Sequence, residues 1–309
     1  MRLTITGGCG YVGSVLVPKL LDLGHSVRVI DSQLFGNYLD KHERLKLIKA
    51  DVRDQTVPIG ATDAIIHLAG IANDPTGALD PKLTWEVNCL ATMQLAERAV
   101  KEGVAQFIYA SSGSVYGVSD APEVTEDAPL VPISEYNKTK AVAERVLLSY
   151  ADEMSIQILR PATVCGFSPR MRLDVMVNSL TIQALENKQM KFNGGNQYRP
   201  NIHIDDMTDL YIWMLERPHL DGIYNAGFEN LQIKQIACMV AEKAGARSIS
   251  MPSNDPRSYR INSDKLLSTG FKPKKTVKDA IEELVNQYHA GNLRNEPQWH
   301  NLLAMQKAA

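Results

Sequence analysis

The sequence predicts an α/β protein built on a doubly wound parallel sheet. Short apolar, often β-branched runs alternate with longer segments whose apolar residues recur at helical spacing, and the first run breaks into a glycine-rich turn. The chain of 309 residues can bury a substantial core as one large domain or two smaller ones. With 44% hydrophobic and 22% charged residues, it has the composition of an ordered globular protein.

Charge and cysteine content exclude several classes of function. The formal net charge of -2 gives no reason to expect a nucleic acid or an anionic membrane as partner. The four cysteines are widely separated and lack metal-ligand spacing, so we expect buried or incidental thiols and no metal. The chain runs from Met1 directly into an apolar run without a charged leader or a long apolar segment, which predicts a cytoplasmic protein.

The N-terminal 31 residues have the pattern of a dinucleotide-binding unit. A strand at residues 3–6 leads into a turn with glycines at 7, 10 and 13, and a helical pattern follows. Such glycines let the backbone turn sharply and approach a diphosphate at the helix N-terminus. We expect the cofactor to contact Gly7, Gly10, Tyr11, Val12 and Gly13.

A second strand at residues 26–30 ends in Asp31, at the distance where an acidic side chain accepts hydrogen bonds from ribose hydroxyls and repels a 2′-phosphate. NAD is therefore expected rather than NADP, with Ser32 beside it. The alternative is a plain carboxylate at a strand end.

Further strands are expected at residues 47–50, 64–68, 106–110 and 156–159. Their carboxyl ends should share one edge of the sheet, where a ligand binds. We expect Asp51 and Val52 to flank the adenine, and Leu68, Ala69 and Gly70 to pass under the cofactor.

A helix from about residue 82 to 101 carries Asn88, which is either a cofactor-site residue or a cap for a neighbouring loop.

The stretch from Ser134 to Lys140 contains a candidate proton-transfer pair. Ser134 is a natural N-cap, and Tyr136 and Lys140 are four residues apart, so they share one face of the helix that follows. A nearby ammonium favours a phenolate, so the pair can transfer protons. An exposed helix face is the plain alternative.

This order of motifs resembles the extended short-chain dehydrogenase/reductase family, and most closely its NAD-dependent nucleotide-sugar epimerase/dehydratase branch, over nearly the whole chain. The resemblance implies a Rossmann-type sheet. It also implies that Tyr136 is the acid-base residue and that Lys140 lowers its pKa while binding the nicotinamide ribose. Ser112, with Ser114 beside it, would contact the reacting sugar hydroxyl.

The residues after Ser112 favour one reaction of that family. Similar 4,6-dehydratases carry an Asp-Glu pair at the positions of Gly113 and Ser114, and similar decarboxylases carry a Glu at the second. Dehydration would lack its acid and base here. We therefore expect a 4-epimerase that works through a transient 4-keto sugar. A 4-dehydrogenase or ketoreductase using the same site, a 4,6-dehydratase and a non-catalytic NAD-binding sensor are the alternatives.

The resemblance also predicts the domain organisation. An NAD-binding domain would span residues 1–165, with 200–227 returning to it, and a smaller discontinuous C-terminal substrate-binding cap would span 166–309, mainly 166–199 and 228–309. A homodimer is usual in the family.

The expected substrate is a nucleotide-diphosphate sugar, bound by Asn178, Arg199 and Arg257. Arg170 and Arg172 are either ligand contacts or solvated loop charges, and Cys165 could approach the substrate from another strand. The base and the sugar are not predicted, because variable cap loops select them.

Overall fold

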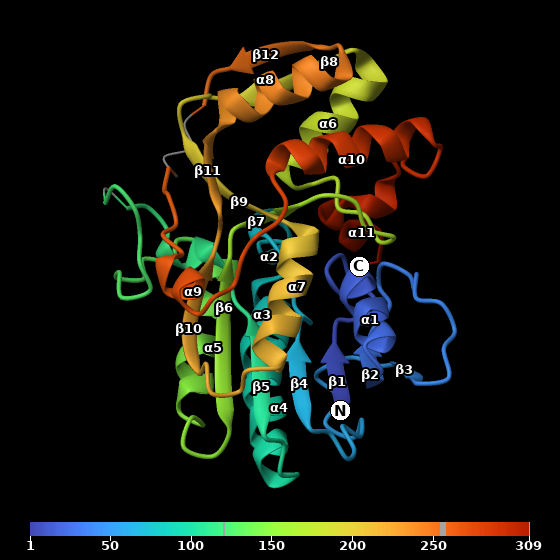
Figure 1. Ribbon diagram of the computed structural model, residues 1–309, viewed down its shortest axis with the longest axis vertical. Helices are drawn as coiled ribbons and strands as arrows, with labels where there is room; N and C mark the ends of the chain where they lie inside the picture. The colour runs from blue at the N-terminus through green and yellow to red at the C-terminus, as the bar shows by residue number, and fades with distance from the viewer. Residues whose placement is uncertain (120, 254–257, 309) are drawn as a thin grey trace.

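The computed structural model describes residues 1–119, 121–253 and 258–308. A large parallel sheet with helices on both faces forms the lower part of Figure 1, and a smaller helical cap lies above its carboxyl edge. The order of the strands across the sheet is β10-β6-β5-β4-β1-β2-β3. Its strands are β1 (Arg2–Thr6), β2 (Ser26–Asp31), β3 (Leu45–Lys49), β4 (Ala64–His67), β5 (Gln106–Ala110), β6 (Ser155–Pro161) and β10 (Gly222–Ala226).

The central strands β4 and β5 are almost completely buried because both faces of the sheet are covered. On one face α1 (Gly13–Asp22) and α7 (Ile204–Leu215) pack over Ile66 and Ile108. On the other face α4 (Ala91–Lys101) and α5 (Glu135–Leu148) pack over Ile65 and Phe107. The order reverses between β1 and β4, which confirms the predicted doubly wound, Rossmann-type sheet and places the ligand crevice at the carboxyl ends of these strands.

The cap is built from three helices around a separate apolar core. These are α6 (Met176–Asn187), α8 (Ile233–Ala244) and α10 (Val277–His289). A parallel pair, β8 (Gln189–Asn193) and β12 (Arg247–Met251), covers one side. A three-stranded sheet of β7 (Thr163–Cys165), β9 (Tyr198–His203) and β11 (Glu229–Gln232) connects the cap to the large sheet.

The remaining elements are short. They are α2 (Asp74–Gly77), α3 (Pro81–Trp85), a π-helical segment (Glu86–Leu90), two 3-10 helices (Gly113–Tyr116 and Pro297–Trp299), α9 (Asp264–Ser268) and α11 (Asn301–Ala308). Two of them alter the predictions. The helix expected over 82–101 is interrupted by the π-helical segment at Asn88, and the end of the chain folds back as α11 against α2.

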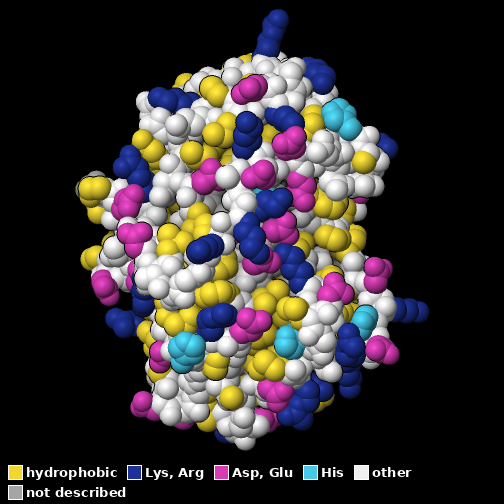
Figure 2. All heavy atoms as spheres, in the orientation of Figure 1, with side chains coloured by type: hydrophobic (Ala, Val, Ile, Leu, Met, Phe, Trp, Pro, Cys, Tyr) yellow, Lys and Arg dark blue, Asp and Glu magenta, His cyan; other side chains and the backbone are white. Residues whose placement is uncertain are grey.

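The face seen in Figure 2 has no large patch of one charge, because lysine and arginine side chains are interspersed with acidic ones. Among the described residues, no helix is long and apolar enough to cross a membrane.

Candidate active site

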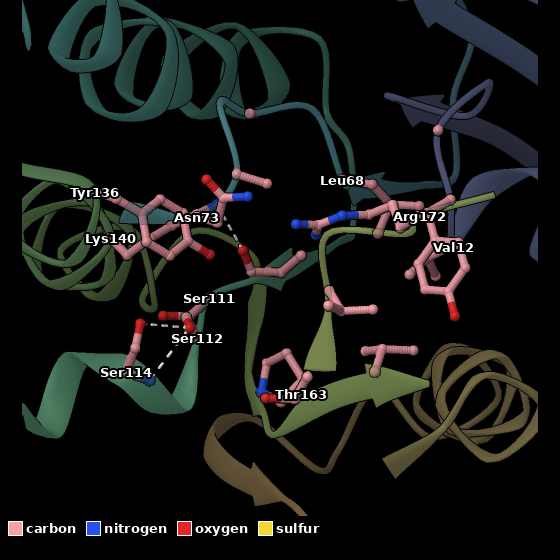
Figure 3. A pocket seen from close by; sticks show the side chains of 18 of the residues that line it. Val12, Leu68, Asn73, Ser111, Ser112, Ser114, Tyr136, Lys140, Thr163 and Arg172 are labelled. Atoms are coloured by element: carbon pink, nitrogen blue, oxygen red, sulfur yellow. Dashed lines mark hydrogen bonds between the residues drawn. The ribbon is translucent and has the colours of Figure 1, made fainter. Parts of the chain in front are cut away.

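A cavity of about 380 Å³ opens at the carboxyl edge of the large sheet, below the cap. The glycine turn, the loop after β4, the serine cluster after β5, helix α5 and the segment after β6 form its walls. Arg199 and Tyr259 reach it from the cap, and Asn301 reaches it from α11. Figure 3 shows Tyr136, Lys140 and the serines on one side and Arg172 near Leu68 and Val12 on the other.

The glycine turn forms a cradle that side chains would fill. Gly7 has a φ of 72°, and a Cβ on it would lie 2.5 Å from the Ala69 nitrogen. A Cβ on Gly13 would lie 2.4 Å from the Gly8 carbonyl oxygen, where helix α1 begins. Gly10, Tyr11 and Val12 line the cavity between them, so the backbone is open to an anion at the helix N-terminus.

Asp31 lies next to the glycine turn but is not part of the cavity wall. Its two carboxylate oxygens accept hydrogen bonds from the backbone nitrogens of Cys9 at 2.9 Å and Gln33 at 2.7 Å. Burial raises the pKa of this carboxyl, and the two backbone donors oppose that rise. Each oxygen keeps a lone pair, so the group can still accept hydrogen bonds from ribose hydroxyls.

Several residues expected at the cofactor lie outside the cavity wall. Ser32 is exposed. The predicted strand over 47–50 ends at Lys49, and Asp51 then pairs with Arg53 at 2.9 Å instead of facing the cavity. Val52 lies outside the wall with it, and at the loop after β4 the wall is formed by Leu68 and Gly70 and not by Ala69.

Asn88 acts as the cap that the sequence left as an alternative. Its amide accepts a hydrogen bond from the Ile71 nitrogen at 2.8 Å and donates to the Ile71 carbonyl at 3.0 Å. It also donates to Thr139 at 3.2 Å, which joins the loop after β4 to α5. The π-helical segment places this buried amide behind the cavity wall, where it fixes the loop that the cofactor would contact.

Helix α5 delivers Tyr136 and Lys140 to the cavity. Ser134 caps it by accepting the Asn137 amide at 3.1 Å, as predicted. Burial raises the pKa of Tyr136, and a hydrogen bond with Ser112 and the charge of Arg172 oppose that rise. Lys140 donates to the Ala110 carbonyl at 2.8 Å, and burial lowers its pKa to about 8. The groups that favour the phenolate in this structure are therefore Ser112 and Arg172, whereas the sequence reasoning assigned that effect to Lys140.

The serine cluster forms a directed hydrogen-bond chain. Ser114 donates to the Asn137 side-chain oxygen at 2.6 Å, so its own oxygen is left as an acceptor. The Ser112 hydroxyl lies 2.7 Å from that oxygen, as Figure 3 shows. The single proton of Ser112 can therefore point to Ser114 or, once the phenol has ionised, to Tyr136.

Position 113 has no room for a side chain. A Cβ there would lie 2.4 Å from the Cδ1 of Ile261 and 3.1 Å from the Pro161 carbonyl oxygen. Ile261 is itself buried in the core. A carboxylate following Ser112 would therefore require the Ile261 side chain to move.

Two arginines enter the cavity from the loop between β7 and α6. Arg172 pairs with Asp174 through two contacts of 3.1 Å, and Asp174 also accepts a hydrogen bond from Asn73 at 2.6 Å. Arg170 stacks its guanidinium on the Phe35 ring, 4.1 Å from the centroid, and donates to Asn301 at 2.6 Å. Both side chains are thus part of the wall and not solvated loop charges.

The expected substrate residues have different positions. Arg199 lines the cavity from β9, and Arg257 lies outside the described residues. Asn178 is fully buried: it accepts a hydrogen bond from the Gly166 nitrogen and donates to the Tyr11 hydroxyl and the Arg172 carbonyl, so it supports the wall from behind.

Cys165 is also away from the cavity wall. Its thiol faces the Ile202 carbonyl, and burial raises its pKa, which gives an inert packed thiol.

Some wall residues were not found from the sequence. Examples are Phe35, Asn73, Thr163 and Asn301. None belongs to a local motif.

Comparisons with known proteins identify the family of the chain. The family model described as "NAD dependent epimerase/dehydratase family" matches residues 3–227. The chain belongs to this family. It is therefore an NAD-dependent enzyme, and the resemblance inferred from the motifs is confirmed.

The chain is similar to the UDP-glucose 4-epimerase of Corynebacterium glutamicum, with 27% identity over 309 residues covering 92% of this chain and 94% of that protein. It is also similar to the UDP-glucuronic acid decarboxylase 1 of Xenopus tropicalis, with 26% identity covering 93% of this chain and 72% of that protein. Among solved structures, the UDP-glucuronic acid 4-epimerase from Bacillus cereus, in complex with UDP-glucuronic acid and NAD, has a TM-score of 0.84 and 27% identity. That match covers 94% of this chain and 99% of that one.

The residues present fit NAD. The glycine cradle is too tight for any Cβ at positions 7 and 13, Asp31 retains free lone pairs, and the buried Nε of Arg170 has no hydrogen-bond partner in the described part of the chain. Gly10, Tyr11 and Val12 would hold the diphosphate, Asp31 the adenosine ribose, and Lys140 the nicotinamide ribose.

Proposed function

We propose that this protein is a nucleotide-sugar 4-epimerase that keeps NAD bound through each turnover. The observation that carries the proposal is the composition of the catalytic corner. Tyr136 and Ser112 face the cavity together, whereas the two following positions hold a glycine without room for a side chain and a serine committed to Asn137. The site therefore has the groups needed to oxidise a carbon that carries a hydroxyl, but it lacks the acid and base needed for elimination at the neighbouring carbons.

The side chains divide the work between proton transfer and charge. Bound NAD would supply the hydride acceptor and donor at C4 of the sugar. Tyr136 takes the proton of the C4 hydroxyl and later returns it, and the Ser112 proton turns toward whichever oxygen carries the negative charge. Arg172 favours that charge from the opposite wall. The Lys140 ammonium, held by the Ala110 carbonyl, would bind the nicotinamide ribose.

The proposed substrate is a nucleotide-diphosphate sugar. Arg199 reaches the cavity from β9, and a guanidinium suits a diphosphate because it donates hydrogen bonds in pairs. The relatives named as UDP-sugar 4-epimerases support a uridine nucleotide as the first substrate to test. Arg257 is kept as a second proposed diphosphate contact.

The test is incubation of the full chain with UDP-, dTDP-, GDP- and CDP-sugars in heavy water, followed by NMR of the products. The panel includes a uronic acid. Inversion at C4 without solvent deuterium is the expected result. Deuterium at C5 with loss of the C6 oxygen, or release of carbon dioxide from the uronic acid, would overturn the proposal. Tyr136→Phe should abolish turnover while NAD stays bound, which separates loss of chemistry from loss of the cofactor.

A further inference from the structure

Arg170 is a buried cation without a matching anion. Its side chain is among the largest that are fully buried, with 1% of the residue exposed. It makes one side-chain hydrogen bond, to the neutral amide of Asn301, and its Nε has no hydrogen-bond partner among residues 1–119, 121–253 and 258–308. Within the same ranges no carboxylate lies within ion-pair distance of it. Burying a charge in this way is unfavourable unless an anion compensates it.

The surroundings of Arg170 show where that anion would lie. Arg170 lines the same cavity as Gly10, Tyr11 and Val12. Its loop is fastened to the glycine turn, because Ser168 donates to the Tyr11 carbonyl at 2.8 Å and the Tyr11 hydroxyl donates to the Gly166 carbonyl at 2.7 Å. The arginine and the glycine turn therefore line one cavity and are held together by hydrogen bonds between their loops.

Arg172 adds a second positive charge near Arg170. Burial, followed by repulsion from Arg172, lowers the pKa of Arg170 to about 10, and the more distant charges of Asp174 and Asp31 offset this only in part. Asp174 is already paired with Arg172 and hydrogen-bonded to Asn73. A ligand with two negative charges would relieve this repulsion.

The C-terminal segment holds Arg170 in place. Asn301 is the first residue of α11 and is 4% exposed. Just before it, the Trp299 carbonyl accepts a hydrogen bond from the Leu173 nitrogen at 2.8 Å, and the Trp299 ring packs on Tyr38 with centroids 5.2 Å apart. The chain end thus covers the cavity between the loop after β2 and the loop after β7.

We propose that Arg170 binds the diphosphate of the dinucleotide from the side opposite the glycine turn, and that Asn301 of the C-terminal helix fixes it there. The C-terminal segment then acts as a strap that retains the cofactor. The substrate also carries a diphosphate, but Arg199 is the arginine that approaches from the cap, whereas Arg170 stacks on Phe35, four residues beyond Asp31 on the adenosine side. The inference concerns cofactor binding alone, so it does not depend on which sugar reaction the enzyme performs.

The decisive variant is Asn301→Asp, which keeps the side-chain size and places a carboxylate on Arg170. The full chain, freed of cofactor, is titrated calorimetrically with NAD, ADP-ribose, adenosine and UDP-glucose. Affinity for NAD and ADP-ribose should fall at least tenfold, while affinity for adenosine and UDP-glucose changes less than twofold. The melting temperature of the cofactor-free variant should equal or exceed that of the wild type, because the buried charge is now compensated.

The matched control is Asn292→Asp, which adds the same charge at an exposed position of the same C-terminal stretch and should leave all four affinities unchanged. Arg170→Met should lose NAD and ADP-ribose affinity as Asn301→Asp does. Unchanged NAD affinity in Asn301→Asp would overturn the proposal, as would an equal loss for adenosine. A loss confined to UDP-glucose would assign Arg170 to the substrate and equally refute the cofactor role.

Discussion

Lys140→Met should make the cofactor-free protein more stable while removing its catalytic function. The side chain is 5% exposed, and burial lowers its pKa from 10.5 to about 8. This lowering of the pKa means that the charged ammonium reduces the free energy of unfolding by about 3 kcal/mol. Methionine removes that cost but also the hydrogen bond to the Ala110 carbonyl, worth about 1 kcal/mol. We expect a net gain of about 2 kcal/mol at pH 7.

The sign of the pH dependence follows from the lowered pKa. Between pH 8 and 10.5 the unfolded chain binds a proton at Lys140 that the folded chain has released, so the folded state gains stability as pH rises through this window. The cost is fully present below pH 8 and absent above 10.5. Urea unfolding of wild type and variant at pH 7 and pH 10 measures it, and the stability advantage of the variant should shrink at the higher pH.

The control is Lys138→Met on the same helix, whose ammonium is exposed and pairs with Glu135. It should change stability by less than about 0.5 kcal/mol at both pH values. A Lys140→Met protein that is less stable than wild type at pH 7, or whose advantage does not depend on pH, would refute the reasoning.

Three further outcomes are expected. Gly117→Ala should lower the free energy of unfolding in urea by roughly 3 kcal/mol or more, because φ is 67° and a Cβ would lie 1.9 Å from the Val131 carbonyl oxygen. The control is Gly24→Ala, at a position that also has positive φ but is open, and equal losses in the two variants would contradict the prediction. Glu144→Gln should cost about 3–5 kcal/mol by leaving Arg160 buried without its partner, and a loss under about 1 kcal/mol would count against that. Asn88→Ala should release the loop at Ile71 and weaken NAD binding about tenfold by calorimetry, whereas unchanged binding would deny the loop its role.

The features that the sequence predicted correctly are local ones. A strand, a turn with four glycines and a helix lie within the first 22 residues, and their order follows from apolar spacing and from glycines that allow a tight turn. The capped helix carrying Tyr136 and Lys140 is equally local, because four residues of spacing fix which side chains share a face. The parallel sheet then follows from the alternation of strands and helices.

What the sequence could not predict depends on contacts between distant segments. Arg170 and Asn301 are 131 residues apart and meet only because the chain end folds back over the crevice. Asp51 was expected at the adenine, but its carboxylate forms an ion pair with Arg53. The pKa of Tyr136 likewise depends on Arg172, which reaches it from a loop of the second half of the chain.

The contact between Gly113 and Ile261 constrains how such an enzyme can be rebuilt. The backbone on both sides of Ile261 is tied to the large-sheet half, because the Val124 nitrogen donates to the Arg260 carbonyl and the Asn262 nitrogen donates to the Val124 carbonyl. Ile261 therefore belongs to the sequence of the cap half but packs against Gly113, the residue after Ser112. A chimera that took the cap of a relative from residue 228 onward would replace the side chain at this contact. Exchanging caps as modules would thus change the packing next to Ser112 together with the cap itself.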